Sequence, residues 1–194
     1  YGIGRSRYRR TKILSWILSV LLLDTKDQKV KSTARHIDEF MTRVQDDKHD
    51  PLRSRQVLTD LFVWLTEAFE LHARHPEVWS EKFMDGGKGA KWQELQLVGS
   101  IVGVAFALAA SPNDVEDRIV QKANDILEAT SSEAWKRIEK AQTKTQWDYI
   151  ARIAKGVLTL LELDPSRASE AVRNRFGSSG YESLEGTILP EEAQ

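Results

Sequence analysis

Two histidines near the end of a helical segment have the spacing of a metal-binding pair. His72 and His75 are three residues apart, which places both imidazoles on one face of a helix. Neither Glu67 nor Glu70 completes a His-Glu-x-x-His or Glu-x-x-His pattern with them. Cationic side chains in the last turn of a helix also offset its dipole. We favour this helix-end role and predict no metal site.

The stretch DGGKGAKWQ, residues 85–93, suggests a phosphate-binding loop. A P-loop needs Gly-x-x-x-x-Gly-Lys followed by Ser or Thr, whereas Lys88 precedes a glycine and Lys91 a tryptophan. The stretch is therefore not a P-loop. Glycine amides with Lys88 and Lys91 at a helix start could still contact an anion. We favour the alternative, a connection that only leads into the next helix.

The N-terminal segment concentrates positive charge. Before position 13 it has no acidic residue and these basic ones: Arg5, Arg7, Arg9, Arg10 and Lys12. Cations at a helix start oppose the helix dipole, so stabilisation of a helix does not explain the cluster. Clustered basic residues are typical of nucleic-acid or anion contacts. We predict such contacts for these five residues, and Lys88 and Lys91 are the further candidates for them.

Two further basic groups have both a structural and a nucleic-acid interpretation. The stretch WKRIEKAQTKTQWDY, residues 135–149, mixes aromatic and basic side chains, but its aromatic residues fall on an apolar helical stripe. We favour a core face there. Arg173 and Arg175 lie near a predicted helix C-terminus, where they would offset the dipole. For these two and for Arg167, both interpretations stay open.

No pattern in the sequence indicates an enzyme. The absence of cysteine excludes thiolate chemistry and disulfides, and it fits a reducing compartment. There is no Gly-x-Ser-x-Gly motif, and the carboxylates are scattered over positions predicted to face solvent. We predict no catalytic residue and no cofactor, and we expect an intracellular location, cytoplasmic or nuclear.

Helical periodicity predicts an all-α fold, a compact multi-helix bundle of about eight helices. Apolar residues recur at helical spacing in nearly every long segment, and no segment alternates with period two. The eight predicted helices span residues 10–23, 29–46, 51–74, 76–84, 90–110, 113–129, 132–142 and 144–163, and a shorter one follows at 165–176. In the helix over 51–74, the predicted buried stripe consists of Leu58, Leu61, Phe62, Leu65, Ala68 and Phe69, with Trp64 and Leu71 at its edge.

Prolines and glycines predict where several helices begin and end. A capping side chain directly precedes proline at Asp50, Ser111 and Asp164, which predicts three helix starts. Ser111 and Thr130 each have an acidic residue three positions later, the spacing of a capping box. Gly177 is predicted to end the last helix.

Two apolar runs are too short to cross a membrane. Ile13–Leu23 has eleven residues and Leu97–Ala110 has fourteen, whereas a span needs about 20. The first run lacks a signal-peptide cleavage site, so we predict a buried first helix. The second is apolar all round, which predicts the central helix, and Gly99 and Gly103 would allow a close helix approach.

Size and charge define the remaining expectations. The 194 residues are 41% hydrophobic, enough for one core, and the net charge of −1 attracts the chain as a whole to neither nucleic acid nor membranes. We predict a basic N-terminal segment at 1–10, a helical domain at 11–177 and a flexible acidic tail at 178–194. Because the chain begins with a tyrosine, we expect a fragment or a processed product.

Five segments in order resemble a known family: RTKILSWILSVLLL, ARHIDEFMTRV, VLTDLFVWLTEAFEL, KWQELQLVGSIVGVAFALA and QWDYIARIAKGVL. Over residues 10–160, their helix order and hydrophobic texture resemble the helical region that follows the ParB-like nuclease domain of GmrSD-type restriction proteins. The resemblance implies that this chain is an accessory helical region of a larger protein. The catalytic part of that protein would then precede residue 1. The chain has neither an Asp-Gly-Gln-Gln-Arg motif nor a His-Asn-His constellation, so no catalytic residue is carried over.

We therefore expect a non-catalytic helical module of a larger protein that contacts nucleic acid through local basic patches. The alternative is a protein-interaction or scaffold domain without nucleic-acid binding. Neutral net charge favours the alternative, and the basic N-terminus favours nucleic acid. The oligomeric state stays open.

Overall fold

The computed structural model describes residues 33–79, 90–131 and 143–177, together with residues 14, 16–18 and 20–22. The regular elements of this described part are all helices, which confirms the predicted all-α fold class. The predicted segments 1–10 and 178–194, the predicted helix over 132–142 and the glycine-rich stretch 85–89 lie outside the described residues.

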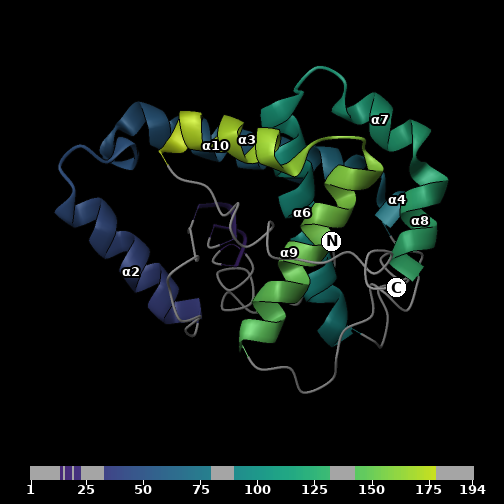
Figure 1. Ribbon diagram of the computed structural model, residues 1–194, viewed down its shortest axis with the longest axis horizontal. Helices are drawn as coiled ribbons and strands as arrows, with labels where there is room; N and C mark the ends of the chain where they lie inside the picture. The colour runs from purple at the N-terminus through teal and green to yellow at the C-terminus, as the bar shows by residue number, and fades with distance from the viewer. Residues whose placement is uncertain are drawn as a thin grey trace.

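Figure 1 shows how the described helices are arranged. In chain order they are α2 (Thr33–Asp46), the 3-10 helix η1 (Pro51–Arg53), α3 (Arg55–Arg74), α4 (Pro76–Trp79), α6 (Ala90–Ala110), α7 (Val115–Gln121), α8 (Ala123–Ser131), α9 (Thr143–Leu160) and α10 (Pro165–Phe176).

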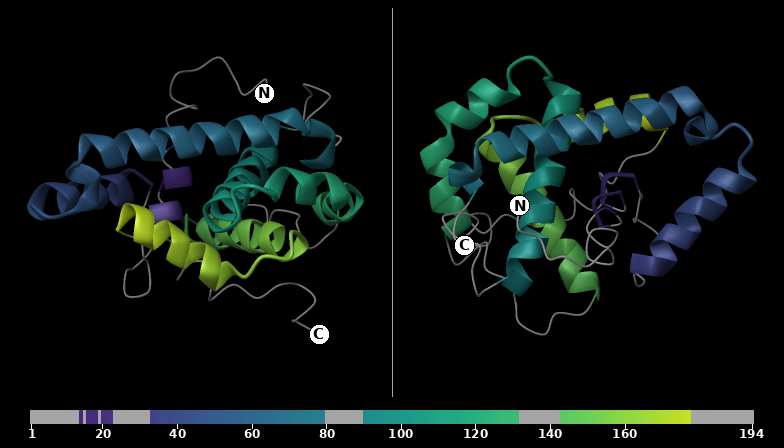
Figure 2. Two further views of the ribbon diagram at one scale, coloured as in Figure 1. Left: turned by 90° about the horizontal axis from the view of Figure 1, so that it is seen from above. Right: turned by 180° about the vertical axis from the view of Figure 1, so that it is seen from behind.

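Helix α6 is the centre of the fold, as its uniformly apolar sequence predicts. It packs along α9 and also contacts α3 and α10. Seen from above, α3 forms one outer layer and α9 and α10 the opposite one, with α6 between them (Figure 2). All residues from Leu95 to Ala107 are buried. A helix surrounded on all sides needs no polar face, which explains its composition.

Two glycines let α6 approach α9 closely. A Cβ atom at Gly99 would lie 2.6 Å from Ile153 Cβ, and one at Gly103 would lie 2.6 Å from Val157 Cβ and 3.0 Å from the Ala154 carbonyl oxygen. Both neighbours are β-branched and belong to the core, so they have little freedom to move away. The predicted role of the two glycines is confirmed.

The buried face of α3 differs from the predicted stripe. Leu61, Leu65 and Ala68 are buried as expected, but Leu58 is 39% exposed and Phe62 is 56% exposed. The remaining buried side chains of α3 are Trp64, Leu71 and His72. The face is therefore rotated toward Trp64, because the Trp64 indole donates a hydrogen bond to the Ala105 carbonyl of α6 (2.9 Å) and stacks on Phe176 of α10.

Two of the three predicted proline-linked caps are confirmed. The Asp50 carboxylate accepts a hydrogen bond from the Leu52 amide, and Asp164 does the same for the Ser166 amide, both at 2.8 Å. Gly177 ends α10 in the left-handed conformation (φ 77°), as predicted.

The prediction that Ser111 caps a helix is wrong. Residues 112–114 form a turn, α7 begins at Val115, and the Ser111 hydroxyl donates instead to the Asp114 carboxylate. The capping-box prediction at Thr130 is also wrong at its first position, because Thr130 lies inside α8 and its hydroxyl donates to the Leu127 carbonyl.

The predicted single helix over 113–129 consists of two helices that meet at Lys122. Backbone hydrogen bonds continue through this point, from the Lys122 amide to the Arg118 carbonyl and from the Ile126 amide to the Lys122 carbonyl, each 2.9 Å. Tertiary contacts define the break: Arg118 donates to the Leu161 carbonyl at the end of α9, while α8 packs against α4. The end of α7 is thus tied to α9, and α8 turns away (Figure 1).

The described residues of the first apolar run belong to the core. Residues 14, 16–18 and 20–22 are helical, and Trp16, Ile17 and Val20–Leu22 are buried. This confirms the predicted buried first helix for that part of the run. Among the helices that the structure describes, none has the length and apolarity needed to cross a membrane.

Candidate functional site

The residues predicted to contact nucleic acid are not placed by the structure. Arg5, Arg7, Arg9, Arg10, Lys12 and Lys88 lie outside the described residues. The backbone of Lys91 belongs to the first turn of α6, but its side chain is not described. These contacts stay predictions.

The two histidines of the predicted helical pair lie in different environments. His72 is fully buried between α3 and α6, whereas the side chain of His75 is 22% exposed at the end of α3. Helical spacing alone suggested one shared face, but the ring of His72 enters the core. In the described part of the chain, no three side chains of the His, Cys, Asp or Glu type are grouped so that they could hold a metal ion.

His72 lies at the centre of a polar cluster in the core. Its ring stacks on Trp79 with centroids 4.4 Å apart, and Trp79 Nε1 donates to the His72 carbonyl at 3.1 Å. The Ser100 hydroxyl donates to the carbonyl oxygens of Gln96 and Leu97, both 3.0 Å away. His72 Nε2 and the Ser100 hydroxyl form a hydrogen bond of 2.8 Å. The cluster therefore ties the ring of His72 to α6 inside the core.

Burial controls the titration of this ring. It lowers the pKa of His72 from its ordinary value of 6.5 to about 3, because a charged imidazolium would lose its hydration in the core. At neutral pH His72 is uncharged and cannot offset the dipole of α3 as the sequence suggested. The same loss of hydration makes the folded state sensitive to acid.

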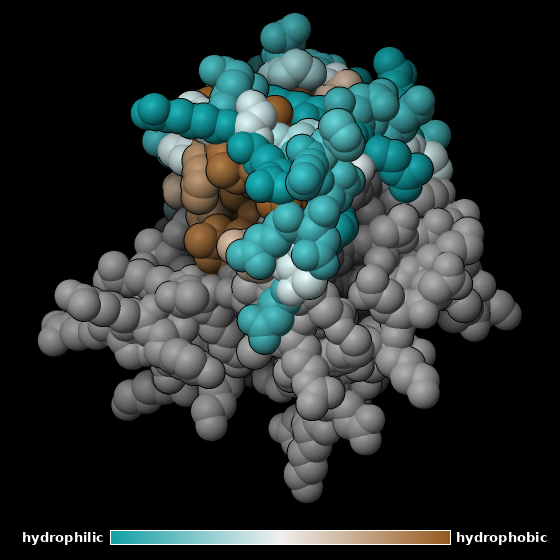
Figure 3. All heavy atoms as spheres, turned by 90° about the vertical axis from the view of Figure 1, so that its left-hand side faces the viewer, coloured by the Kyte–Doolittle hydropathy of each residue, from teal (hydrophilic) through white to brown (hydrophobic). Residues whose placement is uncertain are grey.

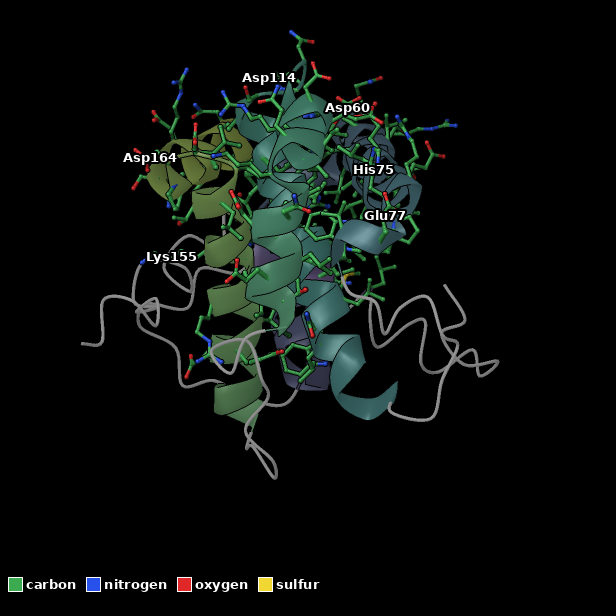
Figure 4. The ribbon with its side chains drawn as sticks, turned by 90° about the vertical axis from the view of Figure 1, so that its right-hand side faces the viewer. Asp60, His75, Glu77, Asp114, Lys155 and Asp164 are labelled. Atoms are coloured by element: carbon green, nitrogen blue, oxygen red, sulfur yellow. The ribbon has the colours of Figure 1, made fainter. Side chains whose placement is uncertain are left out.

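His75, labelled in Figure 4, belongs to a surface ion-pair group with Glu116 of α7. His75 Nε2 lies 3.2 Å from Glu116 Oε1, and Arg74 Nη1 donates to Glu116 Oε2 at 2.7 Å. The hydrogen bond from His75, followed by that from Arg74, lowers the pKa of Glu116. These contacts link α3 to α7 at an exposed position, which indicates a structural role.

A second surface group joins α7 to the end of α9. Lys122 Nζ lies 2.6 Å from Glu162 Oε1, and their hydrogen bond raises the pKa of Lys122 and lowers that of Glu162. Hydrogen bonds from Ser111 and then Arg118 lower the pKa of Asp114. Each group is engaged with an oppositely charged or polar neighbour, so this network stabilises the α7 to α9 junction and offers no free acid or base.

Three arginines lie close in sequence to the contact between the end of α10 and η1. A Cβ atom at Gly177 would lie 2.8 Å from Pro51 Cγ, so the C-terminus of α10 rests on η1. Arg53, Arg173 and Arg175 all lie within four residues of this contact, and all three are exposed. We call this surface the arginine end. Figure 3 shows the side of the molecule on which α2 lies, with hydrophilic side chains over much of the described surface and hydrophobic ones beside them.

Two arginines of the arginine end, Arg53 and Arg175, contact neutral groups. Arg53 Nη1 donates to the Gln45 carbonyl at 3.1 Å, a neutral acceptor that leaves its charge uncompensated. Arg175 lies over the Phe176 ring, 5.2 Å from its centroid. The nearby Asp50 carboxylate is occupied by its capping bond and by Arg43 Nε at 3.2 Å. Arg173 and Arg175 also offset the dipole of α10, which is the structural part of their role.

The arginine end is not predictable from the sequence, because its members come from positions far apart in the chain. Arg173 and Arg175 were recognised as candidates, but Arg53 was not, and nothing in the sequence shows that α10 ends beside η1. Exposure of Phe62 and Val63 was missed as well. The sequence feature that indicates this exposure is an apolar arc on α3 that is wider than one packing partner can cover.

Comparison with known proteins gives no further guidance, since no family model, curated protein or solved structure matches the chain.

Proposed function

We propose that this chain is a non-catalytic helical module that associates with nucleic acid through local basic surfaces, one of which is the arginine end. The observation that carries the proposal is the contact of Gly177 with Pro51, which brings the end of α10 that carries Arg175 against η1, which carries Arg53. Arginines contact phosphate oxygens through charge-assisted and bidentate hydrogen bonds. The resemblance to the helical region of GmrSD-type restriction proteins supports the same class of partner.

The basic N-terminal segment would provide a second contact. With a net charge of −1, the chain has no general attraction to polyanions, so binding depends on such local surfaces. Contacts to phosphates fix position without reading sequence. The proposal is therefore one of sequence-independent binding.

Fluorescence anisotropy of a labelled DNA duplex and a labelled single-stranded RNA, titrated at several salt concentrations, tests the proposal. Each phosphate contact contributes about −0.9 to the slope of log K against log salt on duplex DNA. We expect Arg53→Gln and Arg175→Gln each to reduce the slope by about 1. Replacement of the four N-terminal arginines by glutamine tests the other surface separately.

Arg74→Gln is the matched control, because Arg74 is also exposed but lies at the C-terminal end of α3, whereas η1 precedes the N-terminal end. Arg74 pairs with Glu116. Its slope should equal that of the unmodified chain. Weak binding with a flat salt dependence would refute the proposal. Equal slopes for Arg53→Gln, Arg175→Gln and Arg74→Gln would exclude the arginine end.

A second candidate function is a protein-interaction domain. It is favoured by the large apolar side chains that α3 exposes, Leu58, Phe62 and Val63. This candidate predicts association that persists at high salt, because burial of apolar surface is not screened.

A further inference from the structure

The outward face of α3 carries adjacent apolar side chains at its centre. Phe62 is 56% exposed and Val63 is 49% exposed, and α3 lies along an outer edge of the molecule (Figure 2). An exposed phenylalanine beside an exposed valine leaves apolar area in water that a partner surface could cover. These two residues lie at the midpoint of the outward face of α3.

The hydroxyl protons of the two threonines that flank this midpoint are bonded to carbonyl oxygens of the same helix. The Thr59 hydroxyl donates to the Arg55 carbonyl at 2.9 Å, and the Thr66 hydroxyl donates to the Phe62 carbonyl at 2.8 Å. With their donors satisfied inside the helix, both side chains can be covered without loss of a hydrogen bond by the donor. The α3 face, defined as Thr59, Phe62, Val63 and Thr66, can therefore be buried at low cost.

Opposite charges lie at equal distances on either side of this face. Arg55 precedes Phe62 by seven residues and Glu70 follows Val63 by seven, about two helical turns in each direction. Both side chains are exposed on the same side of α3 as the α3 face. A second α3 helix, antiparallel and related by a two-fold axis at the midpoint, would place Phe62 opposite Val63, Thr59 opposite Thr66 and Arg55 opposite Glu70.

The dipole of α3 supports the same arrangement. Arg55 lies in the first turn, which contains no acidic residue and where a cation is unfavourable. In the antiparallel pair, the partner's Glu70 would compensate this charge. Two antiparallel helix dipoles also attract each other side by side.

From this self-complementary pattern we infer that the α3 face binds a second copy of this chain, forming a two-fold symmetric dimer through antiparallel α3 helices. The inference deepens the protein-interaction candidate and is independent of nucleic-acid binding. One helix pair buries less than the roughly 1,600 Å² of a standard interface, so the dimer is expected to be weak, in the micromolar range or above.

Sedimentation velocity over a range of protein concentrations, without nucleic acid, tests the inference. The unmodified chain should change from monomer to dimer as concentration rises. Phe62→Lys places a charge at the centre of the interface and should leave only monomer. Val120→Lys is the matched control, because Val120 is 55% exposed on α7, away from the α3 face, and its substitution should not change the dimer.

Charge exchange tests the register. Arg55→Glu or Glu70→Arg alone would place like charges opposite each other twice per dimer and should raise the dissociation constant roughly tenfold. The double variant Arg55→Glu with Glu70→Arg restores both pairs and should regain the affinity of the unmodified chain. Circular dichroism confirms that each variant stays helical.

A chain that stays monomeric at its highest soluble concentration would overturn the inference. So would a dimer that Phe62→Lys does not weaken, or a double charge variant as weak as the single ones. Because these measurements contain no nucleic acid, the dimer and the proposed nucleic-acid contact can each fail without the other.

Discussion

The buried imidazole of His72 leads to the sharpest prediction, an acid-dependent loss of stability that a single substitution removes. The pKa of His72 is about 3 in the folded chain and about 6.5 when the chain is unfolded. Between these two values the unfolded chain binds more protons than the folded one. Stability is therefore fully present above pH 6.5 and is lost as the pH falls toward 3.

The two pKa values determine the size of the effect. At pH 5 the unfolded imidazole is almost fully protonated while the folded one is neutral, so His72 lowers the free energy of unfolding by about 2 kcal/mol between pH 7 and pH 5. In a chain of this size, that corresponds to a decrease in Tm of about 4–8 °C.

Urea denaturation at pH 7, 6 and 5 measures this effect in the unmodified chain and in His72→Gln. Glutamine does not titrate and keeps an N–H donor for Ser100. We expect the unmodified chain to lose about 2 kcal/mol more than His72→Gln over this interval. His49→Gln, which replaces an exposed histidine, should behave like the unmodified chain. Surface carboxylates titrate in all three proteins, so the difference isolates His72.

Parallel pH dependence in the unmodified chain and in His72→Gln would refute the reasoning. A direct check is NMR titration of the imidazole signals. The ring of His72 should stay neutral at pH 5, well above its pKa of about 3. An ordinary titration of His72 would show that the ring is not held in the core.

Three further changes in stability follow from the packing, each measured by urea denaturation at pH 7. Gly103→Ala forces a methyl group against Val157 and should lower the free energy of unfolding by about 1–3 kcal/mol. Combined with Val157→Ala, the loss should be smaller than the sum of the two single losses. An unchanged stability of Gly103→Ala would contradict the close approach. Asp164→Ala removes the cap of α10 and should cost about 1 kcal/mol, whereas a stability equal to that of the unmodified chain would contradict the capping role. Trp64→Phe removes the donor to the Ala105 carbonyl and should cost about 1–2 kcal/mol; no loss would show that the hydrogen bond contributes nothing.

Local features of the sequence predicted local features of the structure well. Asp50 and Asp164 cap helices because their carboxylates reach amides only two residues away. Ser111 failed because Asp114 competes for its hydroxyl, and Asp114 in turn pairs with Arg118. The candidate site was less predictable: the basic residues of the N-terminal segment stay predictions, and the arginine end depends on a contact between residues 51 and 177.

The sequence by itself determined the helical class, most helix positions, the central place of α6 and a close helix approach at Gly99 and Gly103, since each depends on periodicity, caps or residue size within one segment. Only the tertiary structure decided which apolar residues of α3 are covered. Trp64 and His72 enter the core because α6 offers a carbonyl and a hydroxyl to them, while Phe62 has no such neighbour within the core and stays exposed. Periodicity gives the width of an apolar arc, but the neighbouring helices decide which part of it is buried.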